Sequence, residues 1–142
     1  MPLLLEIVTP ERLAYSDEVD SVQLPGIEGE LGVLPHHAPL VSTLGVGELR
    51  IRKGGAEESF AIVGGFLQVL PTKVVVLAET ADMASEIDLE KAQEARREAE
   101  KALESGYHEG ADLATARAAL QTALLRERVA QRRHREGPRH RG

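Results

Sequence analysis

The sequence predicts a chain of class β + α, in which a β-sandwich or flattened barrel is followed by an antiparallel two-helix hairpin. Residues 3–80 hold short apolar or alternating runs rich in Val, Ile and Leu and broken by Gly and Pro, which is typical of β-strands. After Ala84, the residues Ala, Glu, Arg, Lys and Leu dominate, and neither Gly nor Pro occurs until Gly106. The boundary therefore falls near residues 80–86, and the expected units are 1–84 and 85–142.

Nine short strands are expected in the first unit. In the run 48–53, Leu and Ile alternate with charged residues, as they do when one face of a strand is buried and the other is solvated. Gly54–Gly55 closes a hairpin, because two glycines permit the positive φ angles of primed turns. Pro71–Thr72 supplies another turn. The expected strands are Leu3–Val8, Arg12–Ser16, Ser21–Leu24, Gly32–Leu34, Leu40–Leu44, Glu48–Lys53, Ser59–Val63, Phe66–Leu70 and Lys73–Glu79.

Two helices are expected in the second unit. The first begins after Ser85, as part of a capping box, or after Asp88, which can cap a helix that starts at Leu89. Its apolar face is a narrow seam made mostly of alanine, and Ser105–Gly110 breaks the pattern. A second stripe then contains Leu113, Ala116, Leu120, Ala123 and Leu124. Two helices joined by so short a loop form an antiparallel hairpin.

The alanine-rich seam makes the hairpin the weaker unit. Burial contributes roughly 25 cal/mol per Å² of apolar area, whereas ordering one residue costs about 1–2 kcal/mol. We therefore expect a hairpin that is marginal alone and can leave the sandwich, open or extend along a partner, while the sandwich stays a fixed body. A permanently docked hairpin is the alternative.

Charge is distributed unevenly along the chain. Residues 1–84 carry twelve acidic and five basic residues, for a charge of −7, and residues 85–112 carry nine and four, for −5. The last thirty residues carry two acids and eight bases, for +6, which suits a basic tip that faces an acidic partner. The alternative is a frayed, solvated tail from about residue 132, because Gly137–Pro138 favours disorder.

Several classes of function are disfavoured. The chain has no cysteine, no apolar run of about 18 residues and no basic leader with a cleavage pattern, so a soluble, untargeted protein is expected. Aromatic residues make up only 3% of the chain, which leaves too few stacking platforms for nucleic acid. No nucleophile with a base and no carboxylate pair suggests an enzyme.

Two other motifs carry little chemistry. Adjacent His36 and His37 cannot both face one metal from a strand, and no acidic residue follows at ligand spacing, so no metal site is expected. The run Gly26–Gly32 has several glycines but lacks the Lys and Ser or Thr of a phosphate-binding loop. We interpret its glycines as turn residues.

Three segments in order give the chain a family resemblance. They are LEIVTPERLAYSDEVDSVQLPGIEG (5–29), GELGVLPHHAPLVSTL (29–44) and VGGFLQVLPTKVVVLAE (63–79). Together with the helices that follow, they resemble the epsilon subunits of F-type ATP synthases through about Val129. The resemblance implies a ten-stranded β-sandwich and a helical hairpin in a non-catalytic rotor subunit. Such a subunit couples rotation to ATP synthesis and inhibits ATP hydrolysis through its C-terminal helices.

The resemblance also implies partners and contact residues. The sandwich would bind the gamma subunit and sit on the ring of c subunits, at the cytoplasmic face of the cell membrane, as a peripheral component of a proton-translocating complex. Glu30, His36, His37 and Pro39 lie in the segment associated with these contacts. The extended hairpin would reach the alpha and beta subunits, and the expected basic contacts to the beta subunit are Arg117, Arg126 and Arg128.

Some bacterial relatives bind regulatory ATP through an Ile/Leu-Asp-x-x-Arg-Ala motif, although no cofactor is required. This chain approximates the motif with Ile87, Asp88, Lys91 and Ala92, and Arg126 matches a basic position of the second helix. Lysine holds a phosphate as a point charge without the planar fork of arginine. Thr122 stands where the nucleotide-binding relatives carry arginine. The alternative function is accordingly an ATP-binding sensor whose hairpin closes on nucleotide.

Overall fold

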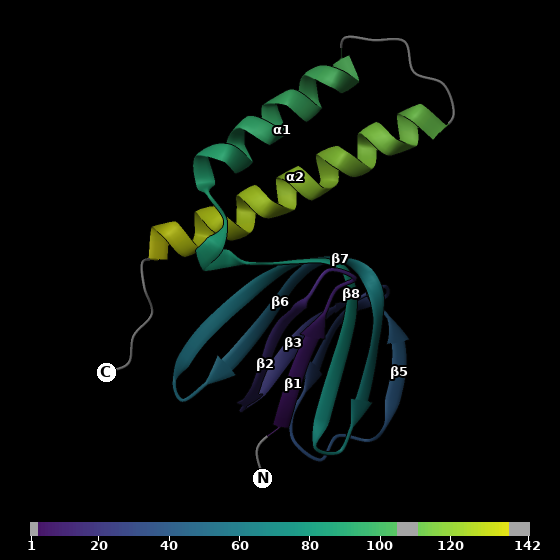
Figure 1. The fold of residues 1–142 in the computed structure, drawn as a ribbon, viewed down its shortest axis with the longest axis vertical. Coiled ribbons are helices and arrows are strands. Elements are labelled where there is room, and N and C mark those ends of the chain that lie inside the picture. The colour runs from purple at the N-terminus through teal and green to yellow at the C-terminus, as the bar shows by residue number, and fades with distance from the viewer. Residues whose placement is uncertain (1–2, 105–110, 137–142) are drawn as a thin grey trace.

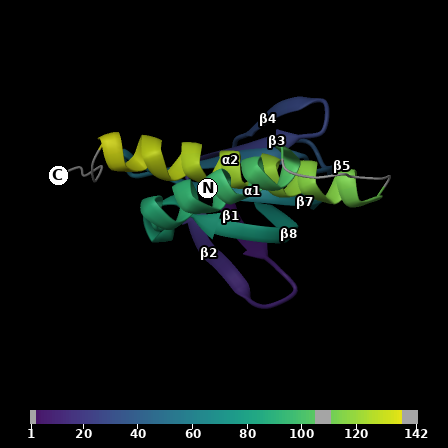
Figure 2. The same cartoon turned by 90° about the horizontal axis from the view of Figure 1, so that it is seen from above.

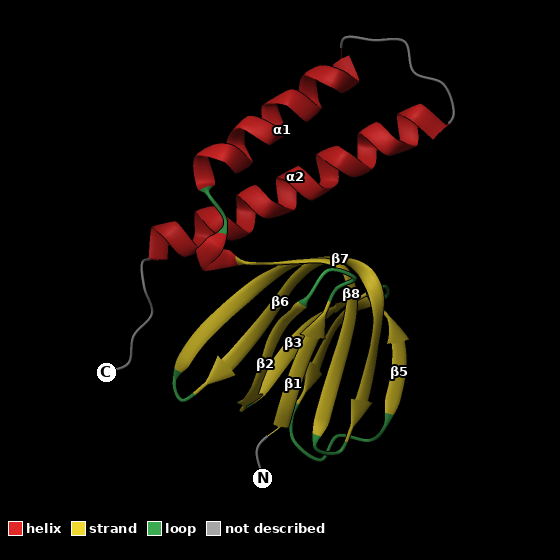
Figure 3. Ribbon diagram, in the orientation of Figure 1, coloured by secondary structure: helices red, strands yellow, loops and turns green. Residues whose placement is uncertain are grey.

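The computed structural model describes residues 3–104 and 111–136, which form a β-sandwich with two helices at one end (Figures 1 and 3). The break expected at Ser105–Gly110 lies outside the described residues. The elements in order are β1 (Leu3–Val8), β2 (Leu13–Val19), β3 (Ser21–Gly26), β4 (Gly29–Val33), β5 (Leu40–Thr43), β6 (Val46–Lys53), β7 (Ala56–Leu70), β8 (Lys73–Met83), the 3-10 turn η1 (Ala84–Glu86), α1 (Leu89–Glu104) and α2 (Ala111–Glu136).

The strands form one continuous sheet that folds over on itself. Its order is β2-β1-β8-β7-β6-β3-β4, and β5 pairs with β7 beside this path. All pairs are antiparallel except β1 with β8. The turn after β2 closes against β6, because the Asp20 N–H donates to the Arg52 carbonyl at 2.8 Å and the Lys53 ammonium pairs with Asp17. The β-sandwich expected from the sequence is therefore confirmed (Figure 1).

Strand β7 explains why eight strands form, fewer than the nine expected from the pattern and the ten implied by the resemblance. The glycines expected to separate two strands, Gly64 and Gly65, have φ of 62° and 115°, and they bend one 15-residue strand without ending it. Pairing with β8 keeps its register across the bend, from Val63 with Thr80 to Gly65 with Ala78. A Cβ on Gly65 would lie 1.9 Å from the Leu77 carbonyl oxygen. Glycine therefore allows the close approach that keeps β7 continuous.

The core lies between the two layers of the folded sheet. Alternate residues of each strand point inward, as in β1, where Leu3, Leu5 and Ile7 are fully buried. The Phe60 and Tyr15 rings meet edge to face with centroids 5.7 Å apart. The buried members of this cluster are Leu3, Leu5, Ile7, Val19, Val22, Leu24, Val33, Leu44, Leu49, Ile51, Phe60, Ile62, Leu67, Val69, Val74, Val76, Ala78 and Ala81.

Helix α1 begins after Asp88, as one of the two expected starts predicted. The Asp88 Oδ1 accepts the Lys91 N–H at 3.1 Å, which is the N-cap bond, and Ser85 lies in the preceding 3-10 turn. Helix α2 continues to Glu136. The expectation of a tail without fixed structure from about residue 132 is therefore wrong for residues 132–136, and residues 137–142 lie outside the described part. The reason is that Arg132 and Arg133 pair with acidic side chains of the sandwich.

The hairpin is docked in this structure. Strand β7 passes beneath α2, which lies across the top of the sandwich, and α1 packs on α2 on the side away from the strands (Figures 1 and 2). A small apolar cluster joins the two units and consists of Ala61, Ala84, Leu125 and Val129, with Ile87 packed against it. The two helices are linked by an ion pair from Arg96 Nε to Glu127 Oε1 at 2.7 Å. Neither described helix is apolar enough over the length needed to span a membrane.

Candidate functional site

A pocket of about 440 Å³ lies between the start of α1 and the middle of α2. Four of the five residues predicted to bind ATP line it, namely Asp88, Lys91, Ala92 and Arg126. The fifth, Ile87, packs against the apolar cluster below the helices. Residues 35 positions apart in sequence are thus brought to one opening only because the hairpin is closed. The other residues that line the pocket are Glu86, Ala95 and Ala123.

The chemistry of this pocket is mixed. Lys91 is exposed, and Arg126 Nε lies 3.8 Å from the Asp82 carboxylate, so one of the two cations already has a partner. Glu86 adds a negative charge that would oppose phosphate. Thr122 does not line the pocket. These groups can attract an anion through two point charges, but they offer no free guanidinium fork.

Glu30 lies in a groove between the β3–β4 hairpin and β5. The groove measures about 500 Å³, and it contains two acidic side chains, Glu28 and Glu30, beside the strongly exposed apolar side chains of Ile27 and Val41. The Ile27 N–H donates to the Thr43 carbonyl at 3.3 Å, which holds the hairpin tip against β5. An acidic and apolar groove of this kind suits a partner loop that carries a cation.

The turn between β4 and β5 contains the other predicted interface residues. His36 is exposed with φ of 69°, a left-handed conformation unusual for a residue with a side chain, and its N–H donates to the Pro71 carbonyl. His37 Nδ1 lies 2.9 Å from the Ala38 carbonyl oxygen, and Pro39 is exposed. The structure thus places this turn and Glu30 at opposite ends of β4, so the predicted interface residues form two separate groups.

Sequence analysis missed an apolar face on the outside of the sheet. Phe66 pairs directly with Leu77 in the neighbouring strand, and their exposed fractions are 58% and 52%. On the other side of β7, Val41 pairs with Gln68 and is 69% exposed, while Leu70 lies further along β7. We call these four apolar residues, Val41, Phe66, Leu70 and Leu77, the outer apolar face. The missed signal was the continuous apolar run of residues 74–77, which indicates a strand that is covered on both sides.

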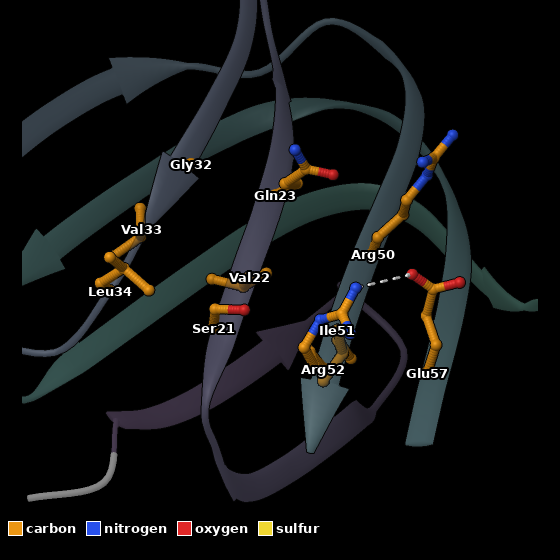
Figure 4. Close-up of a pocket in the computed structure, with 10 residues that line it drawn as sticks. All are labelled: Ser21, Val22, Gln23, Gly32, Val33, Leu34, Arg50, Ile51, Arg52 and Glu57. Carbon is orange, nitrogen blue, oxygen red and sulfur yellow. Dashed lines mark ion pairs between the residues drawn. The ribbon is translucent and has the colours of Figure 1, made fainter. Parts of the chain in front are cut away.

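A third opening crosses β3 and lies between β4 and β6 (Figure 4). Two arginines stand beside it, yet each has a carboxylate neighbour. Arg52 Nη2 is 3.9 Å from Glu57 Oε2, and Arg50 Nε is 3.5 Å from Glu48 Oε1. With both cations compensated, this opening holds no charge that would select a ligand.

The arginines expected to meet the beta subunit have different surroundings. Arg117 and Arg128 are exposed on α2, and neither forms an ion pair with a described residue, whereas Arg126 faces the pocket at the helix pair. Within residues 3–104 and 111–136, no three His, Cys, Asp or Glu side chains gather as metal ligands would. His36 and His37 accordingly have no acidic third ligand beside them.

Comparison with known proteins assigns the family. The model of the ATP synthase Delta/Epsilon chain beta-sandwich domain matches residues 2–84, and the model of the long alpha-helix domain of the same chain matches residues 85–131. The chain belongs to the ATP synthase delta/epsilon family. An ATP synthase epsilon chain from Dehalococcoides mccartyi is 48% identical over 92% of this chain and 94% of its own length. Another from Herpetosiphon aurantiacus is 47% identical over 96% of this chain and all of its own.

Solved structures extend the family assignment to three dimensions. A chain in the cryo-EM structure of the Euglena gracilis mitochondrial ATP synthase is 27% identical, with a TM-score of 0.76 over 89% of this chain and 80% of that one. A chain in the central stalk and c-ring structure from Tetrahymena thermophila shares the fold at 14% identity and a TM-score of 0.58, over 93% of this chain and 96% of that one. Like the epsilon chains from the two bacteria, the protein is a regulatory and structural subunit and not the catalytic one. The recognition made from three sequence segments is therefore confirmed.

Proposed function

We propose that this chain is a rotor subunit in the central stalk of a proton-translocating F-type ATP synthase, where it couples rotation to ATP synthesis and restrains ATP hydrolysis. The observation that carries the proposal is the match of both family domains, in order, across residues 2–131. The folded sheet supplies a rigid body for transmitting torque, and the helices supply an arm. The protein meets the membrane at its cytoplasmic face, through the complex alone.

The outer apolar face is the surface proposed to bind the gamma subunit. A folded domain normally keeps large apolar side chains apart on its surface, and a contiguous group marks an interaction site. Here Phe66 and Leu77 stand side by side, next to an apolar hollow that also includes Val8 and Pro10. Burial of such aromatic and aliphatic side chains is what holds a permanent assembly together.

Contact with the c ring is proposed for two places at the ends of β4, namely Glu30 and the His36–Pro39 turn. Glu30 offers a carboxylate in the groove beside β5, and the exposed His36–Pro39 turn lies at the opposite end of that strand. Two separated contact points resist rotation of the sandwich about either one. This is the geometry needed if the subunit is to turn together with the ring.

Copurification tests the attachment. The double variant Phe66→Glu with Leu77→Glu should lose retention by the gamma subunit, because it would bury two charges in an apolar contact. Leu124→Glu is the matched control, since Leu124 is 41% exposed on α2, away from the sandwich face. Retention of the double variant at wild-type levels would exclude the outer apolar face, and failure of the unaltered chain to bind any rotor component would exclude the rotor function.

The helical arm is the part proposed to inhibit hydrolysis. Arg117 and Arg128 are exposed and without ion pairs among the described residues, so an acidic segment of the beta subunit could receive them once the arm extends. The main core lies wholly within residues 3–81, so a chain ending at Ala84 should still fold and bind the stalk. In the reconstituted enzyme this truncation should raise ATP hydrolysis. Unchanged hydrolysis would remove the inhibitory role.

ATP sensing is the second candidate, and the pocket between the helices favours it. Asp88, Lys91, Ala92 and Arg126 meet there only when the arm is closed, so bound ATP would stabilise the closed arm. Titration of the isolated chain with ATP should show weaker binding for Lys91→Ala and tighter binding for Lys91→Arg, which restores the fork. Lys101→Ala, an exposed lysine on the same helix, is the control. Equal affinities in all four proteins would show that no site lies here.

A further inference from the structure

The end of α2 is held to the sandwich by a polar contact centred on one arginine. Arg132 Nη2 donates to Ser59 Oγ at 3.0 Å and also pairs with the Glu48 carboxylate, while its Nη1 lies 3.9 Å from Glu57 Oε1. The Glu48, Glu57 and Arg132 side chains are 10%, 22% and 22% exposed, so this contact is largely removed from water. We call the three residues that accept from or pair with Arg132, namely Glu48 on β6 and Glu57 and Ser59 on β7, the acidic seat.

Strand geometry explains why the acidic seat faces the helix. Glu57, Ser59 and Ala61 are every second residue of β7, so their side chains point to the same face of the sheet. Glu48 of β6 pairs with Ala61 and shares this face. Ala61 belongs to the apolar cluster that α2 covers. The seat is therefore the polar continuation of the surface on which the arm rests.

Ser59 supplies independent support. It is the one polar residue among the described residues that is buried, at 5% exposure, although it points to the outside of the sheet. A buried hydroxyl needs a hydrogen-bond partner, and Arg132 provides it. The Ser59 hydroxyl is therefore buried and hydrogen-bonded when α2 lies over this part of β7.

Two further arginines add to the contact without sharing its burial. Arg133 Nη1 lies 3.7 Å from Glu58 Oε1, and Arg126 Nε lies 3.8 Å from Asp82 Oδ2. Both pairs are longer than a good hydrogen bond and more exposed, so they contribute less than Arg132 does. The apolar part of the docking surface is also small, with two alanines, a leucine and a valine fully buried.

We propose that Arg132 and the acidic seat form a latch that sets the fraction of molecules whose arm is docked. When the arm leaves, Arg132 and the three seat residues regain water, but the charge-assisted hydrogen bonds between them are lost. Removing the guanidinium leaves Glu48 with only the more exposed Arg50, at 3.5 Å, as a cationic partner, which weakens docking. The latch deepens the regulatory role proposed above, and its consequence for ATP hydrolysis rests on that role, but the docking equilibrium itself does not.

The isolated full chain permits a direct measurement, because it contains no cysteine. Spin labels on Thr72→Cys, in the β7–β8 turn, and Glu98→Cys, on an exposed position of α1, report the distance between sandwich and arm by pulsed electron resonance. The parent protein should show one dominant distance, which spans the sandwich from the β7–β8 turn to the helices at its other end (Figure 1). Arg132→Gln should lower the ratio of docked to undocked molecules about tenfold or more, as expected for loss of a partly buried charge-assisted bond.

Two variants separate the latch from a general loss of structure. Arg128→Gln, on the same helix but exposed and without an ion pair among the described residues, should leave the distance distribution unchanged. The exchange Glu48→Arg with Arg132→Glu should restore docking relative to either single variant. Far-ultraviolet circular dichroism should show the same strand content in all variants, since the main core is untouched. A distance distribution in Arg132→Gln identical to that of the parent would overturn the latch.

Hydrolysis by the reconstituted enzyme distinguishes this failure from failure of the proposed function. If truncation after Ala84 raises hydrolysis while Arg132→Gln leaves the arm docked, the regulatory function stands and the latch is wrong. If Arg132→Gln releases the arm while truncation changes nothing, the latch stands and the inhibitory role is wrong. If both are right, Arg132→Gln should strengthen inhibition, because more molecules have a free arm.

Discussion

The sandwich and the helical arm belong to one chain but are stabilised in different ways. The sandwich buries eighteen apolar side chains in one cluster, including Phe60 and most of the large aliphatic residues. The arm rests on a cluster with four buried members, two of which are alanines. Apolar burial therefore fixes the sandwich, whereas the position of the arm depends on a few contacts that one charge can change. This division fits a body that transmits rotation and an arm that changes position.

The largest effect is expected from a large-to-small substitution in the sandwich. Phe60 is 1% exposed and packs edge to face on Tyr15. Phe60→Ala should lower the free energy of unfolding by about 3–5 kcal/mol, through lost burial and the cavity that remains. Urea denaturation followed by circular dichroism measures this change.

The matched substitution in the arm is Leu125→Ala, at 2% exposure. It should reduce the docked fraction of the arm while the urea midpoint of the sandwich shifts far less than in Phe60→Ala. If the two substitutions lower one cooperative transition equally, the sandwich and arm are a single folding unit, and the division between them is wrong.

A smaller effect, confined to the arm, is expected at the start of α1. Asp88→Ala removes the acceptor for the Lys91 N–H and should destabilise the helix by about 1 kcal/mol. Hydrogen exchange should speed up at the first turn of α1 and remain unchanged in β1–β8. Asp88→Ser keeps a capping oxygen, so its exchange should stay close to that of the parent. Faster exchange throughout the sandwich would contradict the independence of the two units.

The sequence predicted the two units and most strand positions, because these depend on local periodicity. It divided β7 at Gly64–Gly65, because a glycine pair is as typical of a turn as of a bend, and only pairing with β8 decides between them. It could not place Arg132 on the sandwich, since that contact joins residues 73 and 84 positions apart. From the sequence alone, a basic run beside Gly137–Pro138 favours a solvated tail. The structure instead places Arg132 of this run on the acidic seat of the sandwich.

Of the candidate sites, the nucleotide pocket was suggested by a sequence motif, whereas the outer apolar face was not. The motif Ile87–Ala92 suggested a nucleotide site, and the docked arm brings three of its residues to a pocket with Arg126, whose roles in binding stay a prediction. The outer apolar face was not predicted, because Val41 and Phe66 come together only through the pairing of β5 with β7. Residues that share a surface across strands are visible only once the register is known.

The smallest expected effect is the loss of stability at low pH through the Asp17–Lys53 ion pair, which joins β2 to β6. The hydrogen bond from Lys53, together with the Glu18 N–H, holds the pKa of the Asp17 carboxyl below its usual value of 3.8. A lowered pKa means that the carboxylate stabilises the fold above the unfolded pKa and that this contribution is lost as pH falls through the folded one. Asp17→Asn should therefore melt below the parent at pH 7, and the gap should shrink as the pH falls below about 4. Glu28→Gln, at an exposed turn, should show no such gap. Because Asp17 and Lys53 are surface groups, the gap should stay well below that of Phe60→Ala, and a gap that persists unchanged at pH 2 would show that the ion pair is not its cause.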